Sequence, residues 1–224
     1  MTAPGDKPTD EDAGRAGPEE GRQSDEPLPP SDTSDGAAAW TGETMTFEIL
    51  DERPQDAALI PPLLDRTFGP DREAKTVYRL REGLAPAPGL RFVAVDPDAR
   101  MLASLRFWPI TIGPAPAILL GPLAVEPMLQ GRGIGRALVR HGLAAAKRQG
   151  VALCVVVGEP PYYEPFGFEN AHARGLVLPG PVDPLRFQVT ALRLDALEGV
   201  SGLIGRAEGA SPDPDRLRGG DAVA

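Results

Sequence analysis

The feature that most constrains this chain is a glycine-rich turn between an apolar segment and a helix-like segment. The turn has the sequence Gln130-Gly131-Arg132-Gly133-Ile134-Gly135. Residues 117–120 and 123–125 before it predict a strand, and residues 136–149 after it, rich in Ala, Leu and Arg, predict a helix. Gly150 follows where a left-handed cap residue is common. Residues 151–157 are apolar and β-branched, which predicts a buried strand.

The residues of this turn are typical of an anion-binding site. Glycines let the backbone approach a ligand without an intervening Cβ atom, and the first amides of a helix have no intrahelical acceptor. The helix dipole makes the same end partly positive, and Arg132 and Arg136 add full charges. The turn therefore predicts a phosphate or pyrophosphate site. A turn needed only for tight packing would contain the same residues, so the motif alone leaves both interpretations open.

Two common nucleotide-binding loops are excluded. A Walker loop ends in Gly-Lys-Ser or Gly-Lys-Thr, and neither occurs in this region. The dinucleotide fingerprint Gly-x-Gly-x-x-Gly needs a glycine where Arg136 stands. It also needs an acidic residue about 20 positions further on, where this chain has Val155 and Val156. The turn therefore belongs to neither class.

Two motifs, in the right order, resemble a known family. Gln130-x-x-Gly133-x-Gly135 matches the acyl-CoA-binding signature Arg/Gln-x-x-Gly-x-Gly/Ala of the GCN5-related N-acetyltransferases (GNAT), in its usual place between a strand and a helix. The family's Tyr-x-x-x-Gly-Phe is similar to the run Tyr163-Glu164-Pro165-Phe166-Gly167-Phe168. The double tyrosine and the Phe-Gly-Phe resemble the YhbS-like branch of predicted acetyltransferases. The resemblance extends over about residues 45–205.

The resemblance implies an α/β (α+β) GNAT acyl-CoA N-acyltransferase fold. Its central mixed sheet of about 6–7 strands splays between strands four and five and is flanked by about four helices. Pro61 and Pro62 fit poorly inside a helix, so the first helix is expected to begin late or to be broken. Pro122 lacks an N–H and predicts a bulge or an edge at the splay. Strands are expected at residues 47–50, 90–95, 101–112, 175–178 and 187–192, the last two ending the sheet, and helices at residues 57–68 and 71–81.

The ends of the chain differ in composition from the middle. The first 44 residues hold 11 acidic against 3 basic residues, with six Pro and six Gly. Such segments bury too little apolar surface to offset the entropy of ordering them. Residues 1–44 and 206–224 are therefore expected to be disordered tails around one domain at residues 45–205. Most of the net charge of −9 lies in the first tail, so the nearly neutral domain lacks a strongly basic face for nucleic acid.

Cysteine and histidine are rare in this chain. Cys154 is the only cysteine and lies in an apolar run, so a buried thiol is expected, and no intrachain disulfide can form. His141 and His172 are isolated, so no metal site is expected. No segment resembles a signal peptide or a transmembrane helix. We therefore expect a cytoplasmic protein without membrane or nucleic-acid partners, as a monomer or homodimer.

The resemblance implies acetyl-CoA, or another acyl-CoA, as co-substrate. The pantetheine arm is expected to pair with the backbone near the end of the fourth strand, and the pyrophosphate to lie on the amides of the turn. A backbone N–H of the central strand would polarise the acyl carbonyl. The cofactor-binding residues implied are Leu123, Ala124, Val125, Gln130, Gly131, Arg132, Gly133, Ile134, Gly135 and Arg136.

Acyl transfer to an amine needs a neutral amine and a group that protonates the leaving thiolate. Tyr163 stands five residues before Phe168, as the family's tyrosine does, and is expected to be the general acid. Many relatives carry a Glu on the fourth strand as general base, but residues 120–122 are Leu, Gly and Pro and cannot take a proton. Glu159, just past the fifth strand, is the nearest carboxylate. A chain of waters, or an amine that arrives neutral, would serve equally.

Three functional hypotheses fit these observations. The first is an acetyl-CoA-dependent N-acetyltransferase acting on a primary amine, of a small molecule or of a protein. The second is a non-catalytic acyl-CoA-binding module, which the missing strand-four carboxylate keeps open. The third is an interaction protein whose acidic tail recruits a basic partner. Arg72, Arg79 and Arg81 in the second helix either attract an acidic substrate or are solvated helix charges, which is the ordinary explanation.

Overall fold

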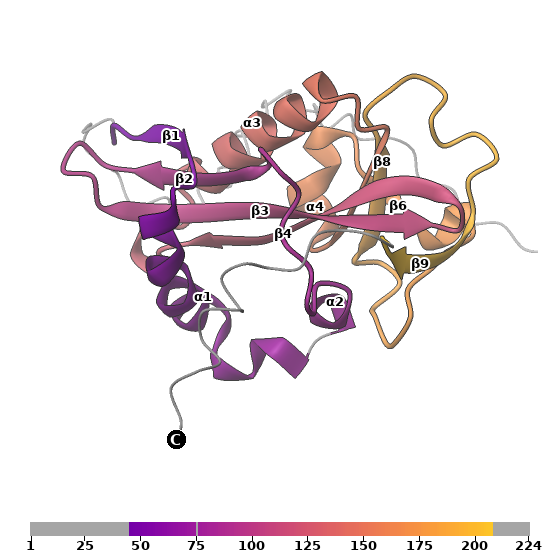
Figure 1. Cartoon of the computed structure of the whole chain (residues 1–224), viewed down its shortest axis with the longest axis horizontal. Helices are drawn as coiled ribbons and strands as arrows, with labels where there is room; N and C mark the ends of the chain where they lie inside the picture. The colour runs from indigo at the N-terminus through magenta and orange to yellow at the C-terminus, as the bar shows by residue number, and fades with distance from the viewer. Residues whose placement is uncertain (1–44, 75, 208–224) are drawn as a thin grey trace, which may run out of the picture. The chain divides into compact units, whose positions relative to one another are not determined.

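The structure is a computed structural model that describes residues 45–74 and 76–207 (Figure 1). The predicted acidic tail at residues 1–44 lies outside the described residues, as does nearly all of the predicted C-terminal tail. All structural statements below refer to the described part. It folds around one mixed sheet with helices on both faces.

The sheet is antiparallel through its first four strands, and the pairings β4–β5 and β7–β9 are parallel. The strand order is β1-β2-β3-β4-β5-β8-β6, while β9 pairs with both β3 and β7. The bounds are β1 (Glu48–Asp51), β2 (Arg91–Val95), β3 (Met101–Ile112), β4 (Ala115–Val125), β5 (Leu153–Val157), β6 (Glu169–Asn170), β7 (Leu176–Val177), β8 (Phe187–Ala191) and β9 (Gly202–Arg206).

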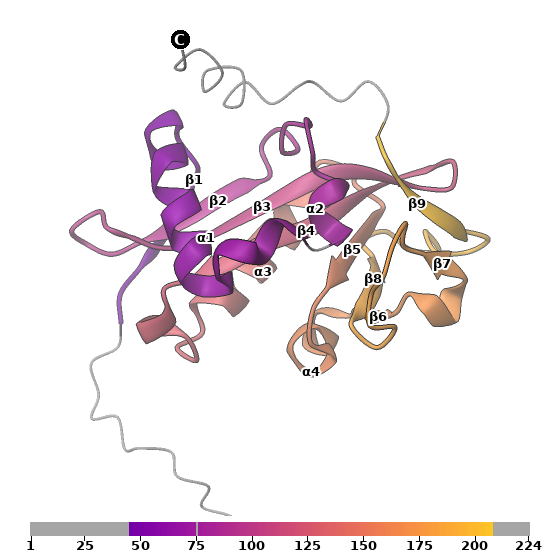
Figure 2. The ribbon, with the colours of Figure 1, turned by 90° about the horizontal axis from the view of Figure 1, so that it is seen from below.

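Helices cover the two faces of the sheet separately. The long helix α3 (Ile134–Arg148) packs on β2, β3 and β4 from one side, whereas α1 (Ile60–Phe68) and α2 (Thr76–Arg79) lie on the other (Figures 1 and 2). The one-turn helix α4 (Pro160–Tyr163) follows β5. α3 buries an apolar stripe that includes Ile134, Leu138 and Val139, as its 3.6-residue periodicity predicts.

The prolines near the first helix act as expected. A 3-10 helix (Pro54–Leu59) comes first, and α1 begins only at Ile60, so that Pro61 and Pro62 occupy its first turn, where a missing N–H is harmless. The second helix, in contrast, is shorter than predicted. Residues 71–81 form a 3-10 turn (Pro70–Ala74) and the four-residue α2. A segment that buries so few apolar side chains cannot stabilise a long helix by packing.

The sequence analysis did not predict two of the strands, β6 and β9. The predicted strands at residues 175–178 and 187–192 exist as β7 and β8, but they do not end the sheet, because β6 precedes them and β9 follows. β9 contains Gly202 and Gly205, and its local strand propensity is low. It forms because β3 offers a partner, with Ile112 opposite Ile204 and Ile110 opposite Arg206. Long-range pairing here overrides local preference.

The splay predicted for the middle of the sheet is present. β4 and β5 pair only at Ile118 with Cys154 and at Leu119 with Val155, after which they diverge. β4 also has a bulge opposite β3, which is seen as a shift in the pairing register across Gly121 and Pro122. The structure therefore confirms the GNAT fold class, and the bulge predicted from Pro122 as well. Beyond Leu120 none of the described strands pairs with the β5-facing edge of β4.

Gly142 on α3 allows the helix to approach β3. A Cβ atom there would lie 2.5 Å from Cε2 of Phe107, which is fully buried. We expect Gly142→Val to lower the free energy of unfolding by about 2 kcal/mol or more, because this overpacking outweighs the small gain in helix propensity. Urea unfolding followed by circular dichroism measures the change.

A matched control for Gly142→Val is Ala144→Val, on the exposed face of the same helix. It introduces the same β-branched side chain, and we expect it to lower the free energy of unfolding by only about 0.6 kcal/mol through helix propensity. Equal effects at both positions would contradict the packing argument.

Candidate active site

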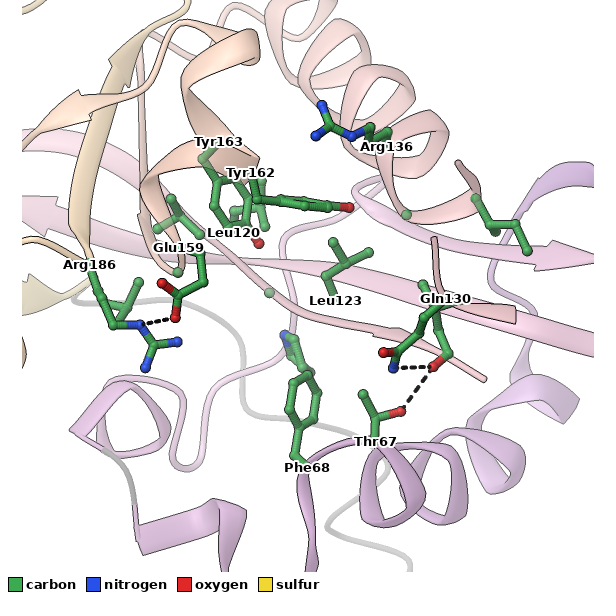
Figure 3. Close-up of a pocket in the computed structure, with 18 of the residues that line it drawn as sticks. Thr67, Phe68, Leu120, Leu123, Gln130, Arg136, Glu159, Tyr162, Tyr163 and Arg186 are labelled. Atoms are coloured by element: carbon green, nitrogen blue, oxygen red, sulfur yellow. Dashed lines mark hydrogen bonds and ion pairs between the residues drawn. The ribbon is translucent and has the colours of Figure 1, made fainter. Parts of the chain in front are cut away.

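A cleft of about 770 Å³ opens where β4 and β5 diverge. Its walls come from the end of α1, the α2 region, the second half of β4, the glycine-rich turn, the end of β5 and α4 (Figure 3). Ten of the twelve residues singled out in the sequence line it. They are Leu123, Val125, Gln130, Gly131, Gly133, Ile134, Gly135, Arg136, Glu159 and Tyr163.

The glycine-rich turn forms one end of the cleft. Gly133 is the N-cap of α3 with φ +85°, and Gly131 has φ +78°, both in the left-handed region that other residues rarely adopt. A Cβ atom at either position would meet no described heavy atom within 4 Å, so the backbone faces open space. The first amides of α3 therefore face a space that an anionic group can occupy.

The exposed edge of β4 continues from this turn. Leu123 and Val125 line the cleft, whereas the side chain of Ala124 is buried on the opposite face against α1. Ala124 can therefore contribute to the cleft only through its backbone. The carbonyl of Val125 accepts hydrogen bonds from Gln130 Nε2 and from Thr67 Oγ1, both at 3.3 Å (Figure 3). Arg132, the second residue outside the lining, is exposed on the turn.

The two tyrosines of α4 point into different parts of the cleft. Their rings meet edge to face, with centroids 4.9 Å apart. Tyr162 extends toward the turn (Figure 3), where its hydroxyl lies 2.6 Å from the position a Cβ of Gly135 would take. The guanidinium of Arg136 lies 5.2 Å from the Tyr162 ring centroid. Any larger residue at position 135 would therefore displace the Tyr162 hydroxyl.

Tyr163 lies deeper, at the splay. It is 8% exposed and packs edge to face on Phe168, while its ring lies against Gly158, where a Cβ would be 2.2 Å from Cε2. Burial raises the pKa of Tyr163 well above its ordinary value, although the nearby cations Arg186 and Arg81 oppose this. The phenol therefore stays protonated at neutral pH and is able to donate a proton.

Glu159 lies at the mouth of the cleft. It precedes α4 as its N-cap residue. Its Oε1 forms an ion pair with Nε of Arg186 at 3.1 Å (Figure 3). Both side chains are substantially exposed to solvent. The structure thus brings Glu159 and Tyr163 into one cleft but gives the carboxylate a cationic partner that the sequence analysis did not identify.

The wall opposite Tyr162 consists of residues that the sequence analysis did not assign to a site. Phe68 and Thr67 come from the end of α1 (Figure 3). Tyr78 comes from α2. Arg81 follows α2 and is buried, at 8% exposure. The sequence analysis named Arg81 only as a charge that either attracts an acidic substrate or is solvated. It did not identify the other three residues, because the positions of α1 and α2 over the splay depend on tertiary packing.

Other candidate residues are accounted for by packing. Cys154 is a buried free thiol whose pKa is raised by burial, as a structural role predicts. In the described residues no cluster of three His, Cys, Asp or Glu side chains is placed to hold a metal ion. None of the helices described there has both the length and the apolar character needed to cross a membrane.

Comparison with known proteins agrees with this geometry. A family model for the acetyltransferase (GNAT) domain matches residues 88–170. The uncharacterized N-acetyltransferase YhbS of Escherichia coli K12 is 39% identical over 155 residues, covering 68% of this chain and 92% of YhbS. The uncharacterized N-acetyltransferase YjhQ of the same strain is 32% identical over 143 residues, covering 62% of this chain and 77% of YjhQ.

Two solved structures are similar over most of the chain. YhbS from Escherichia coli in complex with CoA has a TM-score of 0.65 and 36% identity, covering 75% of this chain and 93% of that one. A GNAT acetyltransferase from Brucella melitensis in complex with acetyl-CoA has a TM-score of 0.55 and 31% identity, covering 73% and 97%. From its motifs, its splayed sheet and these relatives, the chain belongs to the GNAT family of N-acetyltransferases.

Proposed function

We propose that this protein transfers the acetyl group of acetyl-CoA to a primary amine of a small molecule, with Tyr163 as general acid. The observation that carries the proposal is the position of Tyr163. Its buried phenol lies in the same cleft as the glycine-rich turn, at the point where β4 and β5 separate. A phosphate-binding end and a proton donor within one continuous cleft suit acyl transfer from a long, anionic thioester.

Acetyl-CoA fits the residues present. The open space before Gly131 and Gly133, the first amides of α3 and the charge of Arg136 suit a pyrophosphate. The edge of β4 from Leu123 to Val125, which no described strand pairs on the β5 side, suits the amides of a pantetheine arm through backbone groups that include those of Ala124. Arg132 belongs to this proposal as an exposed charge beside the turn. When bound, the co-substrate supplies an acetyl thioester.

The reaction balances with the groups in the cleft. The amine nitrogen forms a bond to the acetyl carbon, and the carbon–sulfur bond breaks. The amine loses one proton, and the sulfur gains one from the phenol of Tyr163. The product is an amide and a free thiol, after which the tyrosinate regains a proton from solvent. The buried position of Tyr163 keeps this proton in place until the thiolate forms.

We propose Glu159 as the base that accepts the proton of the amine. It lies in the same cleft and is accessible, and its Oε1 forms an ion pair with Nε of Arg186. We expect Glu159→Gln to lower kcat/KM about 100-fold at pH 7. The deficit should shrink toward pH 10, because the free amine then deprotonates without help. Steady-state pH–rate profiles of both proteins measure this.

The shape of the pH profile decides the role of Glu159. A deficit that stays constant from pH 7 to pH 10 would contradict the base assignment and would leave Glu159 as a partner of Arg186 only. Asp183 offers a control: it is an acidic residue just upstream of Arg186 and outside the cleft lining, so Asp183→Asn should leave the profile unchanged.

The alternative, a non-catalytic acyl-CoA-binding module, predicts binding without turnover. The test is release of free CoA thiol from acetyl-CoA across a panel of primary amines, with product identity checked by mass spectrometry. Amine-dependent thiol release with a matching acetylated product supports the proposal. Tight acetyl-CoA binding without turnover on any amine would favour the binding module.

A further inference from the structure

Arg81 is the only basic residue that is buried among the described residues. It is only 8% exposed and lines the cleft, yet no described carboxylate forms an ion pair with it. Its Nε atom is buried and makes no hydrogen bond to any of the described residues. Arg106, by comparison, donates to both oxygens of Glu52 at 2.7 Å. Buried charges in folded proteins are normally paired, so Arg81 lacks a partner that its position calls for.

The surroundings of Arg81 leave its charge intact. Its guanidinium carbon lies 4.9 Å from the ring centroid of Tyr78, and Tyr78 supplies a hydrogen bond and a favourable electrostatic contact. Burial lowers the pKa of Arg81 to about 10, which still leaves the side chain protonated at neutral pH. A permanent cation therefore lies inside the cleft with an aromatic ring as its main neighbour.

Arg81 lies in the part of the cleft near Tyr163, where the amine acceptor is expected to bind. Its Nη2 lies 3.3 Å from where a Cβ of Gly121 would be, so it sits beside the bulge of β4, and it interacts electrostatically with Tyr163. The glycine-rich turn follows the far end of β4, beyond Val125. The charge is thus close to the proposed site of proton transfer and separate from the residues proposed to hold the pyrophosphate.

We propose that Arg81 binds a carboxylate on the amine acceptor, so that the substrates are amino acids rather than simple amines. This inference rests on the proposed acetyltransferase function. A guanidinium presents a planar fork of donors that matches a carboxylate in a bidentate pair. With Arg81 beside the splay, an acceptor held by its carboxylate places a nearby amino group next to Tyr163. The bound substrate then supplies the counter-charge that the chain lacks.

The test uses pairs of acceptors that differ only in charge. The panel contains natural α-amino acids, β-alanine and 4-aminobutyrate, each with its own carboxamide, and aminoalkylphosphonates of the same lengths. We expect wild-type enzyme to prefer the acid over the carboxamide at least 50-fold in kcat/KM. In Arg81→Met we expect kcat/KM for the acid to fall at least 50-fold, mainly through KM, while the carboxamide changes less than threefold.

Arg79→Met provides the matched control. Arg79 is exposed on α2, two residues from Arg81 and outside the cleft lining, so the variant makes the same charge change. We expect it to keep the wild-type preference. Arg81→Lys should retain part of the preference, because it keeps the charge but loses the fork. The affinity for acetyl-CoA, measured by calorimetry, should be equal in wild type and in the three variants. Arg81→Met should not lower the thermal midpoint, because it removes a buried charge that has no described acidic partner.

Several outcomes would overturn the proposal. Equal activity of wild type on acids and carboxamides would exclude a carboxylate site while leaving the acetyltransferase function standing. Equal losses on both members of a pair in Arg81→Met would mean that Arg81 acts on the acetyl group and not on the acceptor. A preference for the phosphonates would assign the site to another anion. If wild type neither binds acetyl-CoA nor turns over any amine, the proposed function itself fails.

Discussion

Tyr163→Phe is expected to lower kcat at least 100-fold while leaving acetyl-CoA affinity within about twofold of wild type. Removal of one hydroxyl takes away the proposed proton donor, and general acid catalysis of this kind contributes about 10²–10⁴ to a rate. The phenylalanine ring still packs on Phe168 and Gly158, so the fold and the cleft are kept. Steady-state kinetics and calorimetry measure the two quantities.

Tyr162→Phe is the matched comparison for Tyr163→Phe. It removes the same group from the neighbouring ring, but the hydroxyl of Tyr162 lies at Gly135 on the turn and not at the splay. We expect a loss below about tenfold, in KM for acetyl-CoA rather than in kcat. Gly158→Ala adds a second check, because its Cβ would displace the Tyr163 ring and should reproduce most of the kcat loss. A larger kcat defect in Tyr162→Phe would transfer the acid role to that residue.

The second large effect is expected for Gly133→Glu, which should weaken acetyl-CoA binding more than 100-fold. The new side chain would enter the open space before the first turn of α3 and put a negative charge where a pyrophosphate is proposed to lie. The backbone at φ +85° would also be strained by about 1–2 kcal/mol. Calorimetric titration of acetyl-CoA into wild type and variant measures the loss.

Gly150→Glu separates strain from charge. Gly150 has φ +80°, and a Cβ there would also meet no described heavy atom within 4 Å, but it lies just beyond the C-terminus of α3. This variant should lose a similar amount of stability and yet bind acetyl-CoA as wild type does. Equal binding losses in the two variants would assign the effect to backbone strain and would contradict a phosphate site at Gly133.

Those parts of the molecule that follow from contiguous residues could be predicted. The turn, α3 and β5 lie in one stretch whose apolar periods and glycines act locally, and the family motif fixes their order. Gly150 ends its helix with a positive φ for the same reason. β3 was also expected from its apolar run, the splay from the family resemblance, and a bulge or an edge in β4 from Pro122.

Those parts that depend on distant segments could not be predicted. β9 carries two glycines and forms only because β3 offers an edge. The sequence did not distinguish three arginines near the second helix, but their environments in the structure differ. Arg72 is paired with Asp65 at 2.7 Å, Arg79 is exposed and Arg81 is buried in the cleft. Arg186 lines the cleft because it directly precedes β8, a strand that comes after both motifs in the sequence.

The bulge in β4 has a consequence for solubility. An unpaired strand edge is a template for any extended chain, and the splay leaves such an edge within this sheet. The exposed ladder is short, because it begins only after Leu120 and β4 ends at Val125. Pro122 removes one donor from it, and the register shift there bends the strand. A strand edge that is this short and irregular is a poor template for pairing with another chain.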